Sequence, residues 1–331
     1  MERIELIAPC HFGMEAVLKR EIQDLGYDVS RVEDGKITFI GDMEAVCYAN
    51  VFLRSAERIL IKIGTVHAET FDELFEGTRA LPWEKYIPED GKFWVAKATS
   101  IKSKLFSPSD IQSIMKKAMV ERLKKVYHKE WFTEDGASYP VRVTFMKDEA
   151  VIGLDTSGES LHKRGYRKLT SKAPITETLA SALILFTPWK KNRILVDPFC
   201  GSGTFPIEAA MIAANMAPGM NRSFLADRWT NLIPKKTWYD VMDEAHDVLD
   251  LHVDTDIQGY DIDPNVVKAA RENAKMAGVD HLIHFQQRPV SELNHPKKYG
   301  FVITNPPYYN GMMKTYFYQF QGPKPPRPKD K

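Results

Sequence analysis

Residues 193–204 read RILVDPFCGSGT, an apolar strand and a glycine-rich turn that opens a helix predicted over 205–215. Glycines at 201 and 203 let the backbone turn sharply and approach a ligand where a larger side chain would collide. Alone, this pattern is typical either of a cofactor site or of an ordinary tight turn. Because the Gly-Lys-Ser/Thr sequence of a triphosphate-binding loop is missing, nucleoside triphosphate binding is not expected.

Strands alternate with helices on both sides of this turn, which predicts a parallel, doubly wound sheet. Ligands of such sheets bind at the carboxyl ends of the strands. Two later strand ends carry polar motifs, GYDID over 259–263 and NPPY over 305–308. The predicted elements are helices at 175–186, 205–215 and 264–277 and strands at 193–196, 257–260, 282–285 and 300–304.

The chemistry of these two motifs suits a nucleoside-containing cofactor and an amine. Asp261 can accept hydrogen bonds from both hydroxyls of a ribose, and Ile262 can lie against an adenine face. Asp263 suits the N-cap before Pro264, which would leave Asp261 free.

The NPPY motif offers two acceptors for one amine. The side-chain oxygen of Asn305 and the carbonyl of Pro306 can both accept from an exocyclic amine, because Pro306 and Pro307 stiffen the loop. Tyr308 can stack on a planar base. The alternative, that the prolines only stop a strand, is disfavoured by the presence of all three motifs at strand ends.

The first part of the chain has a different order of elements. Strands at 4–8, 27–32, 36–40 and 58–66 and helices at 12–25 and 43–54 give βαββαβ, the ferredoxin-like unit. A helix at 71–78, a strand at 93–99, a long helix opening at Pro108 and a hairpin at 141–146 and 150–155 follow.

The charge balance is nearly neutral, with 45 Lys and Arg against 44 Asp and Glu among 331 residues. This excludes a uniformly basic nucleic-acid coat, yet clustered cations with an interleaved aromatic suit a phosphate backbone. For the long helix alone, a solvated basic face is an equally good interpretation. The candidate RNA-binding residues are Lys102, Lys104, Lys116, Lys117, Lys124, Lys163, Arg164, Tyr166 and Arg167.

Three dispersed cysteines, Cys10, Cys47 and Cys200, form neither a disulfide framework nor a spaced zinc site. No apolar run approaches the roughly 20 residues of a membrane span, and the first residues lack a signal-peptide core. We therefore expect a cytoplasmic protein without a metal. Cys200 is interpreted as a small packing residue of the turn, and the oligomeric state stays open.

At the three strand ends the sequence resembles class I S-adenosylmethionine-dependent methyltransferases. Residues 197–204 are similar to their first motif, Asp261 to their ribose-binding acid, and 305–308 to the fourth motif of enzymes that methylate exocyclic or amide nitrogens. APITETLA over 173–180 is similar to the segment beside the methionine part of the cofactor. The resemblance implies that Ala173, Pro174, Glu177, Asp197, Phe199, Cys200, Gly201, Gly203, Thr204, Asp261, Ile262 and Gln287 bind the cofactor, and that Asn305, Pro306, Pro307 and Tyr308 are catalytic.

The stretch LDTSGESLHKRGYR over 154–167, with the ferredoxin-like unit before it, resembles THUMP-domain RNA methyltransferases. Within them the chain is most similar to bacterial enzymes that make N2-methylguanosine in large-subunit ribosomal RNA. The resemblance implies an α/β protein that methylates guanine N2 in 23S ribosomal RNA, with S-adenosylmethionine as cofactor, S-adenosylhomocysteine as product and RNA as partner. The implied domains are a ferredoxin-like domain (1–66), a THUMP RNA-binding domain (67–160), a Rossmann-like methyltransferase domain (161–320) and a basic, Pro-rich tail (321–331).

Other functions share part of this pattern. A tRNA guanine-N2 methyltransferase, a DNA adenine methyltransferase and a protein glutamine methyltransferase would use the same fourth motif. A non-catalytic RNA-binding assembly factor is the alternative of another class.

The sequence after Tyr308 departs from the family. Tyr309-Asn-Gly stands where relatives usually have Gly, and residues 312–320 resemble the family's final strand. Because the sheet of this fold needs further strands and helices, we expect about 50–60 family residues to be missing at the Tyr308/Tyr309 junction.

Overall fold

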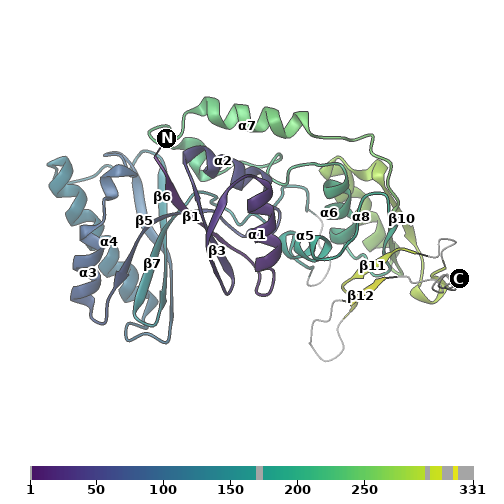
Figure 1. Ribbon diagram of the computed structural model, residues 1–331, viewed down its shortest axis with the longest axis horizontal. Helices are drawn as coiled ribbons and strands as arrows, with labels where there is room; N and C mark the ends of the chain where they lie inside the picture. Colours follow the sequence, from purple (N-terminus) through teal and green to yellow (C-terminus); the bar gives the residue numbers. More distant parts are fainter. Residues whose placement is uncertain (1, 169–173, 295–298, 308–315, 320–331) are drawn as a thin grey trace, which may run out of the picture. The chain divides into compact units, whose positions relative to one another are not determined.

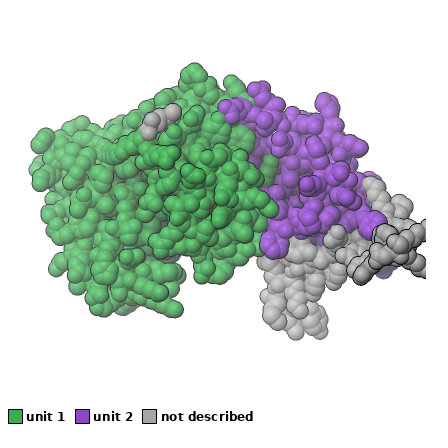
Figure 2. Space-filling model, viewed as in Figure 1, with its two compact units in different colours: residues 1–161, 223–243 green, residues 162–222, 244–331 purple. Residues whose placement is uncertain are grey.

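The computed structural model describes residues 2–168, 174–294, 299–307 and 316–319, the last of these as backbone only. The chain divides into two compact units. Unit 1 comprises residues 1–161 and 223–243, and unit 2 comprises residues 162–222 and 244–331 (green and purple in Figure 2).

Unit 1 contains one seven-stranded sheet of order β2-β3-β1-β4-β7-β6-β5. Strands β4, β1, β3 and β2 are antiparallel neighbours, which confirms the ferredoxin-like order. Its elements are β1 (Ile4–Pro9), α1 (Glu15–Asp24), β2 (Asp28–Glu33), β3 (Lys36–Gly41), α2 (Met43–Phe52), β4 (Leu60–His67), α3 (Phe71–Ala80), η1 (Trp83–Lys85), β5 (Lys92–Ile101), α4 (Pro108–Tyr127), β6 (Ser138–Met146) and β7 (Glu149–Asp155) (Figure 1).

The sequence did not indicate that the two N-terminal patterns share this sheet. Strand β4 ends the ferredoxin-like unit and pairs antiparallel with β7, from Leu60 opposite Asp155 to His67 opposite Glu149. The hydrogen-bonded ladder therefore runs without interruption from the ferredoxin-like strands into the THUMP strands.

The two faces of the sheet differ. Residues in register point to the same face, so Leu6, Ile61, Leu154 and Val141 share one face with Val95. Helix α4 covers this face, because the side-chain amide of Gln112 donates to the Val95 carbonyl at 2.8 Å. The opposite face carries Ile7, Leu60, Gly153, Arg142 and Lys97 in register.

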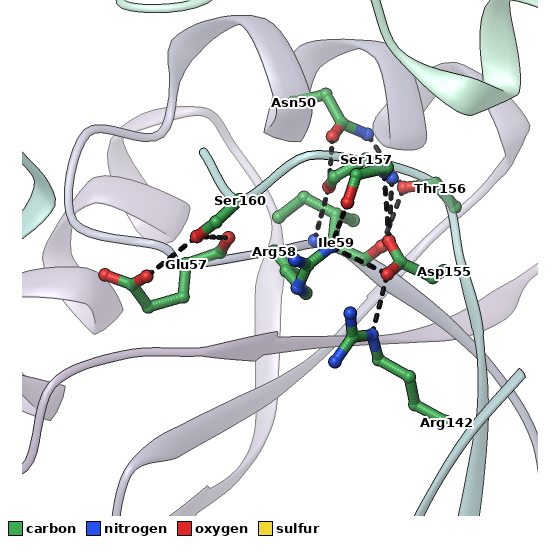
Figure 3. A network of polar contacts seen from close by, with 10 residues as sticks. Asn50, Glu57, Arg58, Ile59, Arg142, Asp155, Thr156, Ser157 and Ser160 are labelled. Atoms are coloured by element: carbon green, nitrogen blue, oxygen red, sulfur yellow. Dashed lines mark hydrogen bonds and ion pairs between the residues drawn. The ribbon is translucent and has the colours of Figure 1, made fainter. Parts of the chain in front are cut away.

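The end of β7 is held by a buried polar network (Figure 3). One carboxylate oxygen of Asp155 accepts from Arg58 Nη1 at 2.8 Å and from Arg142 Nε at 2.7 Å. The other accepts from the backbone N–H groups of Ser157 and Gly158. Asp155 thus fixes the exit of the chain from the sheet, which explains an acid within the DTSG sequence.

Replacing Asp155 by alanine should lower the free energy of unfolding by about 3–5 kcal/mol, because two partly buried guanidinium groups would lose their anion. The Arg58 and Arg142 side chains are 18% and 23% exposed. Urea unfolding measures this, with Arg31→Ala as control, since Arg31 is 67% exposed and its pair with Glu33 is on the surface. A loss no larger than that of the control would contradict the account.

Residues 223–243 belong to unit 1 although they interrupt unit 2 in the sequence. Trp229 is fully buried, stacks on Tyr139 with ring centroids 4.8 Å apart, and donates from Nε1 to the Ser138 carbonyl at 2.9 Å. This stretch contains η2 (Leu225–Arg228) and the start of α7 (Lys235–Asp247), a helix that the sequence analysis did not predict.

Unit 2 contains a five-stranded sheet of order β10-β9-β8-β11-β12. The first four strands are parallel, which confirms the doubly wound prediction, and β12 is antiparallel to β11. No helix in the described part of the chain is long and apolar enough to cross a membrane. Its elements are α5 (Glu177–Phe186), β8 (Leu195–Asp197), α6 (Thr204–Ala213), β9 (Ile257–Asp261), α8 (Pro264–Ala277), η3 (Asp280–Leu282), β10 (Ile283–Gln287), η4 (Val290–Glu292), β11 (Phe301–Thr304) and β12 (Tyr316–Gln319).

Candidate active site

The three sequence motifs lie at the carboxyl ends of three adjacent strands, β9, β8 and β11. The Thr304 hydroxyl at the end of β11 donates to Asp197 Oδ1 at the end of β8, at 2.6 Å. The backbone N–H of Cys200 donates to the Tyr260 carbonyl on β9 at 2.8 Å. The topology therefore brings the predicted site residues of the three motifs to one edge of the sheet.

The glycine-rich turn packs too closely for a side chain. Gly203 precedes α6 with φ +90°, and a Cβ there would lie 3.0 Å from Ala270 Cβ. Cys200 is 5% exposed, and burial raises the pKa of its thiol well above the ordinary value. A neutral, buried thiol is a poor nucleophile, which agrees with a packing role for Cys200.

Asp261 is held by the backbone on both oxygens. Its Oδ2 accepts from the Gly201 N–H at 3.1 Å, and its Oδ1 accepts from the Asp263 N–H at 3.0 Å. The expectation that Asp261 is free is therefore wrong, whereas Asp263 caps α8 as predicted and accepts from Asn265 N–H at 2.8 Å. Each carboxylate oxygen keeps a second lone pair, so Asp261 can still accept from a ribose.

Two further cofactor candidates flank Asp261. Ile262 is 70% exposed, so its side chain is available to an adenine ring. Gln287 ends β10 in register with Asp261, and its side-chain amide donates to the Ile262 carbonyl at 3.1 Å.

Asp197 is an almost fully buried acid, 2% exposed, at the centre of this edge. Burial raises its pKa to about 7, hydrogen bonds from Thr304 and the Phe199 N–H oppose the rise, and the charge of Asp261 adds to it. Asp197 thus changes protonation near neutral pH.

This acid should make the stability depend on pH. Its folded pKa of about 7 lies above the ordinary 3.8, so the folded state keeps a proton that the unfolded chain loses. The free energy of unfolding should therefore fall by up to about 4 kcal/mol between about pH 4 and pH 7. Urea unfolding over this range tests it: Asp197→Asn should remove this slope, and an unchanged slope would refute the assignment.

Asn305 follows β11 and carries an acceptor without a donor. Its Oδ1 is buried and has no hydrogen-bond partner among the described residues. Buried acceptors are normally satisfied, so a ligand donor is the expected partner. Pro306 is half-buried and Pro307 exposed, whereas the predicted Tyr308 and Ala173 lie outside the described residues.

The start of α5 is joined to the turn through Arg167. Glu177 Oε1, at the first residue of α5, lies 3.0 Å from Arg167 Nε. Arg167 Nη2 donates to Thr204 Oγ1 at 2.6 Å. Of the other candidates, Pro174 and Phe199 are half-buried.

Three residues predicted to bind RNA are instead buried in unit 2, so this assignment is wrong for them. Arg164 and Tyr166 are each 2% exposed, and the Tyr166 hydroxyl donates to Glu208 Oε1 at 2.8 Å. Arg164 lies 3.7 Å from Glu208 Oε2, and Arg167 faces Glu177. Sequence reasoning missed Glu208, although a single acid in the otherwise apolar α6 signals a buried partner.

Three of the predicted RNA-binding lysines are paired with acids. Lys104 pairs with Glu69, Lys116 with Glu134 and Lys124 with Glu130. The other three, Lys102, Lys117 and Lys163, are exposed.

A hollow of about 470 Å³ on the Arg142 face of the unit 1 sheet adds cations that the sequence analysis missed. Arg58, Lys97 and Arg142 line it together with the hydroxyl groups of Thr99, Thr144 and Ser160 and one acid, Glu57. These residues come from separated strands, so no sequence pattern announced them. Among the described residues, no group of His, Cys, Asp or Glu side chains could hold a metal.

Family comparisons cover most of the chain. Residues 5–60 match the RlmL ferredoxin-like domain, residues 68–155 the THUMP domain, and residues 164–316 the RMKL-like methyltransferase domain.

Known proteins match over the same region. YpsC of Bacillus subtilis (strain 168), provisionally described as an RNA methyltransferase, is 46% identical over 93% of this chain and 80% of its own length. Ribosomal RNA large subunit methyltransferase K/L of Cellvibrio japonicus (strain Ueda107) is 32% identical over 92% of this chain, which spans 42% of that protein. The solved structure of SMU.472, a provisional methyltransferase complexed with SAH, is 40% identical over 95% of this chain and 83% of its own, with a TM-score of 0.89.

Proposed function

The chain belongs to the family of RNA methyltransferases that combine an RlmL ferredoxin-like domain, a THUMP domain and an RMKL-like methyltransferase domain, and we propose that it methylates the exocyclic N2 amine of a guanine in 23S ribosomal RNA. The observation that carries the amine assignment is the unpartnered Asn305 oxygen at the end of β11. The choice of ribosomal RNA is supported by the name of the Cellvibrio relative.

The residues at the sheet edge fit S-adenosylmethionine. Asp261 would accept from the ribose, the exposed Ile262 would cover the adenine, and the turn at Gly203 leaves room for close approach. The solved relative complexed with SAH supports this cofactor. The cofactor supplies a methyl group on a sulfonium, which is already a good leaving group.

The protein's own contribution is to position the acceptor amine. Asn305 Oδ1 and the Pro306 carbonyl would each accept one hydrogen of the amine and turn its lone pair toward the methyl carbon. The amine loses its extra proton after transfer, so no strong general base is required. We propose that the guanine is flipped out of its helix and stacks on Tyr308, because a paired base is out of reach.

The hollow on the Arg142 face of the sheet is the RNA contact that we propose in unit 1, together with the exposed Lys102, Lys117 and Lys163. Lys97→Glu should weaken RNA binding about 5- to 10-fold at low salt and reduce its salt dependence, because a phosphate contact is lost. Filter binding at several salt concentrations measures this. The matched variant Lys117→Glu reports on the α4 face, and equal effects of both, or none, would refute the preference for the hollow.

Competition with nucleic acids tests the substrate class. Unlabelled ribosomal RNA should suppress methyl transfer to a labelled RNA substrate, and double-stranded DNA at equal phosphate concentration should not. Suppression by DNA alone would favour a DNA adenine methyltransferase, which uses the same kind of acceptor pair.

A further inference from the structure

The segment 164–168 enters unit 2 directly after unit 1 ends at Leu161. Its Arg167 side chain is only 12% exposed and makes three contacts. Nη2 donates to the Ile175 carbonyl at 2.9 Å and to Thr204 Oγ1 at 2.6 Å, while Nε lies 3.0 Å from Glu177 Oε1. One guanidinium therefore joins the entrance of α5 to the first residue of α6.

The next residue of this segment reaches the other side of the same turn. The Lys168 N–H donates to Asn273 Oδ1 at 3.3 Å, and Asn273 Nδ2 donates to the Ser202 carbonyl at 3.1 Å. Asn273 is fully buried on α8. Residues 167 and 168 thus hold both neighbours of Gly203, which itself has no side chain to hold the turn.

A planar guanidinium with fixed donor directions sets such distances more strictly than a flexible ammonium group. We propose that Arg167 is a positioning residue, which fixes the first turn of α5 against the glycine-rich turn and thereby shapes the part of the cofactor pocket between Glu177 and Thr204. This inference deepens the proposed function and rests on it.

Binding of S-adenosylhomocysteine by isothermal titration calorimetry tests the proposal. Arg167→Gln should weaken binding about 10-fold or more, because charge-assisted hydrogen bonds are lost. Arg167→Lys keeps the charge without the fork and should lie between Arg167→Gln and the wild type. Transfer at saturating S-adenosylmethionine should stay within about two-fold, since Arg167 does not touch the reacting atoms.

A double-mutant cycle shows whether Arg167 acts through the turn. Thr204→Val removes the hydroxyl that Arg167 binds, so the double variant should bind no more weakly than Arg167→Gln. Additive losses would overturn the proposal.

The pH dependence gives a readout that lost stability would not produce. Burial raises the pKa of Glu177, and Arg167 and Arg164 lower it, whereas Glu208 raises it further. Without Arg167 the carboxyl should take up a proton at higher pH, so the affinity of Arg167→Gln should fall more steeply than that of the wild type from about pH 8 to pH 6.

Tyr166→Phe is the matched control, because it removes a hydrogen bond to Glu208 from the same segment without touching the turn. It should lower the melting temperature but leave the affinity unchanged. Equal weakening by Tyr166→Phe, or unchanged affinity in both Arg167 variants, would overturn the proposal. If the wild type binds no S-adenosylhomocysteine, the proposed function itself fails, which is a distinct result.

Discussion

Asn305→Ala should reduce methyl transfer about 10²- to 10³-fold while leaving the affinity for S-adenosylhomocysteine within about two-fold. The loss is expected because the Asn305 oxygen would no longer orient the amine, and the cofactor is proposed to bind at the neighbouring strand ends. Asn305 Oδ1 has no partner among the described residues, so its removal should not lower the melting temperature. Single-turnover transfer, calorimetric binding and thermal unfolding together measure the three effects.

Asn305→Asp is the matched variant, since it keeps an acceptor oxygen at the same position. It should retain more activity than Asn305→Ala. Normal turnover by Asn305→Ala would refute the assignment, and a parallel loss of cofactor binding would move Asn305 from the amine site to the cofactor site.

Asp261→Ala should weaken cofactor binding about 100-fold. Two charge-assisted hydrogen bonds to the ribose, each contributing about 1.5 kcal/mol, would be lost. The turn would also lose the acceptor of the Gly201 N–H, which Asp261 Oδ2 holds at 3.1 Å. Equilibrium binding of S-adenosylhomocysteine is the measurement.

Asp263→Asn is the control for this substitution. Asparagine caps a helix as well as aspartate does, so the α8 cap should persist and the affinity should change by less than about two-fold. If Asp263→Asn weakened binding as much as Asp261→Ala, the local negative charge rather than the ribose contact would be responsible.

Much of the fold could be predicted because local signals agreed with the tertiary structure. The glycine-rich turn at 201–203 and the strand ends at Asp261 and Asn305 are short motifs beside buried strands, and parallel topology brings such ends together. The ferredoxin-like order could be inferred from the succession of elements alone.

The residues that could not be predicted depend on contacts between distant segments. The pairing of β4 with β7 and the hollow between Arg58, Lys97 and Arg142 join residues from different parts of the sequence. Arg164, Tyr166 and Arg167 were misjudged because a basic, aromatic segment has the same composition whether it faces RNA or buried acids such as Glu208. Burial decides between the two, and one sequence does not show it.

The most direct test of the central claim is transfer of labelled methyl from S-adenosylmethionine to ribosomal RNA and tRNA, each purified from cells that lack this protein, followed by nucleoside analysis. We expect label in N2-methylguanosine of ribosomal RNA. Label in tRNA alone would keep the chemistry and change the substrate. Absence of label from both RNAs, with S-adenosylhomocysteine unbound, would contradict the account and indicate an RNA-binding protein without transferase activity.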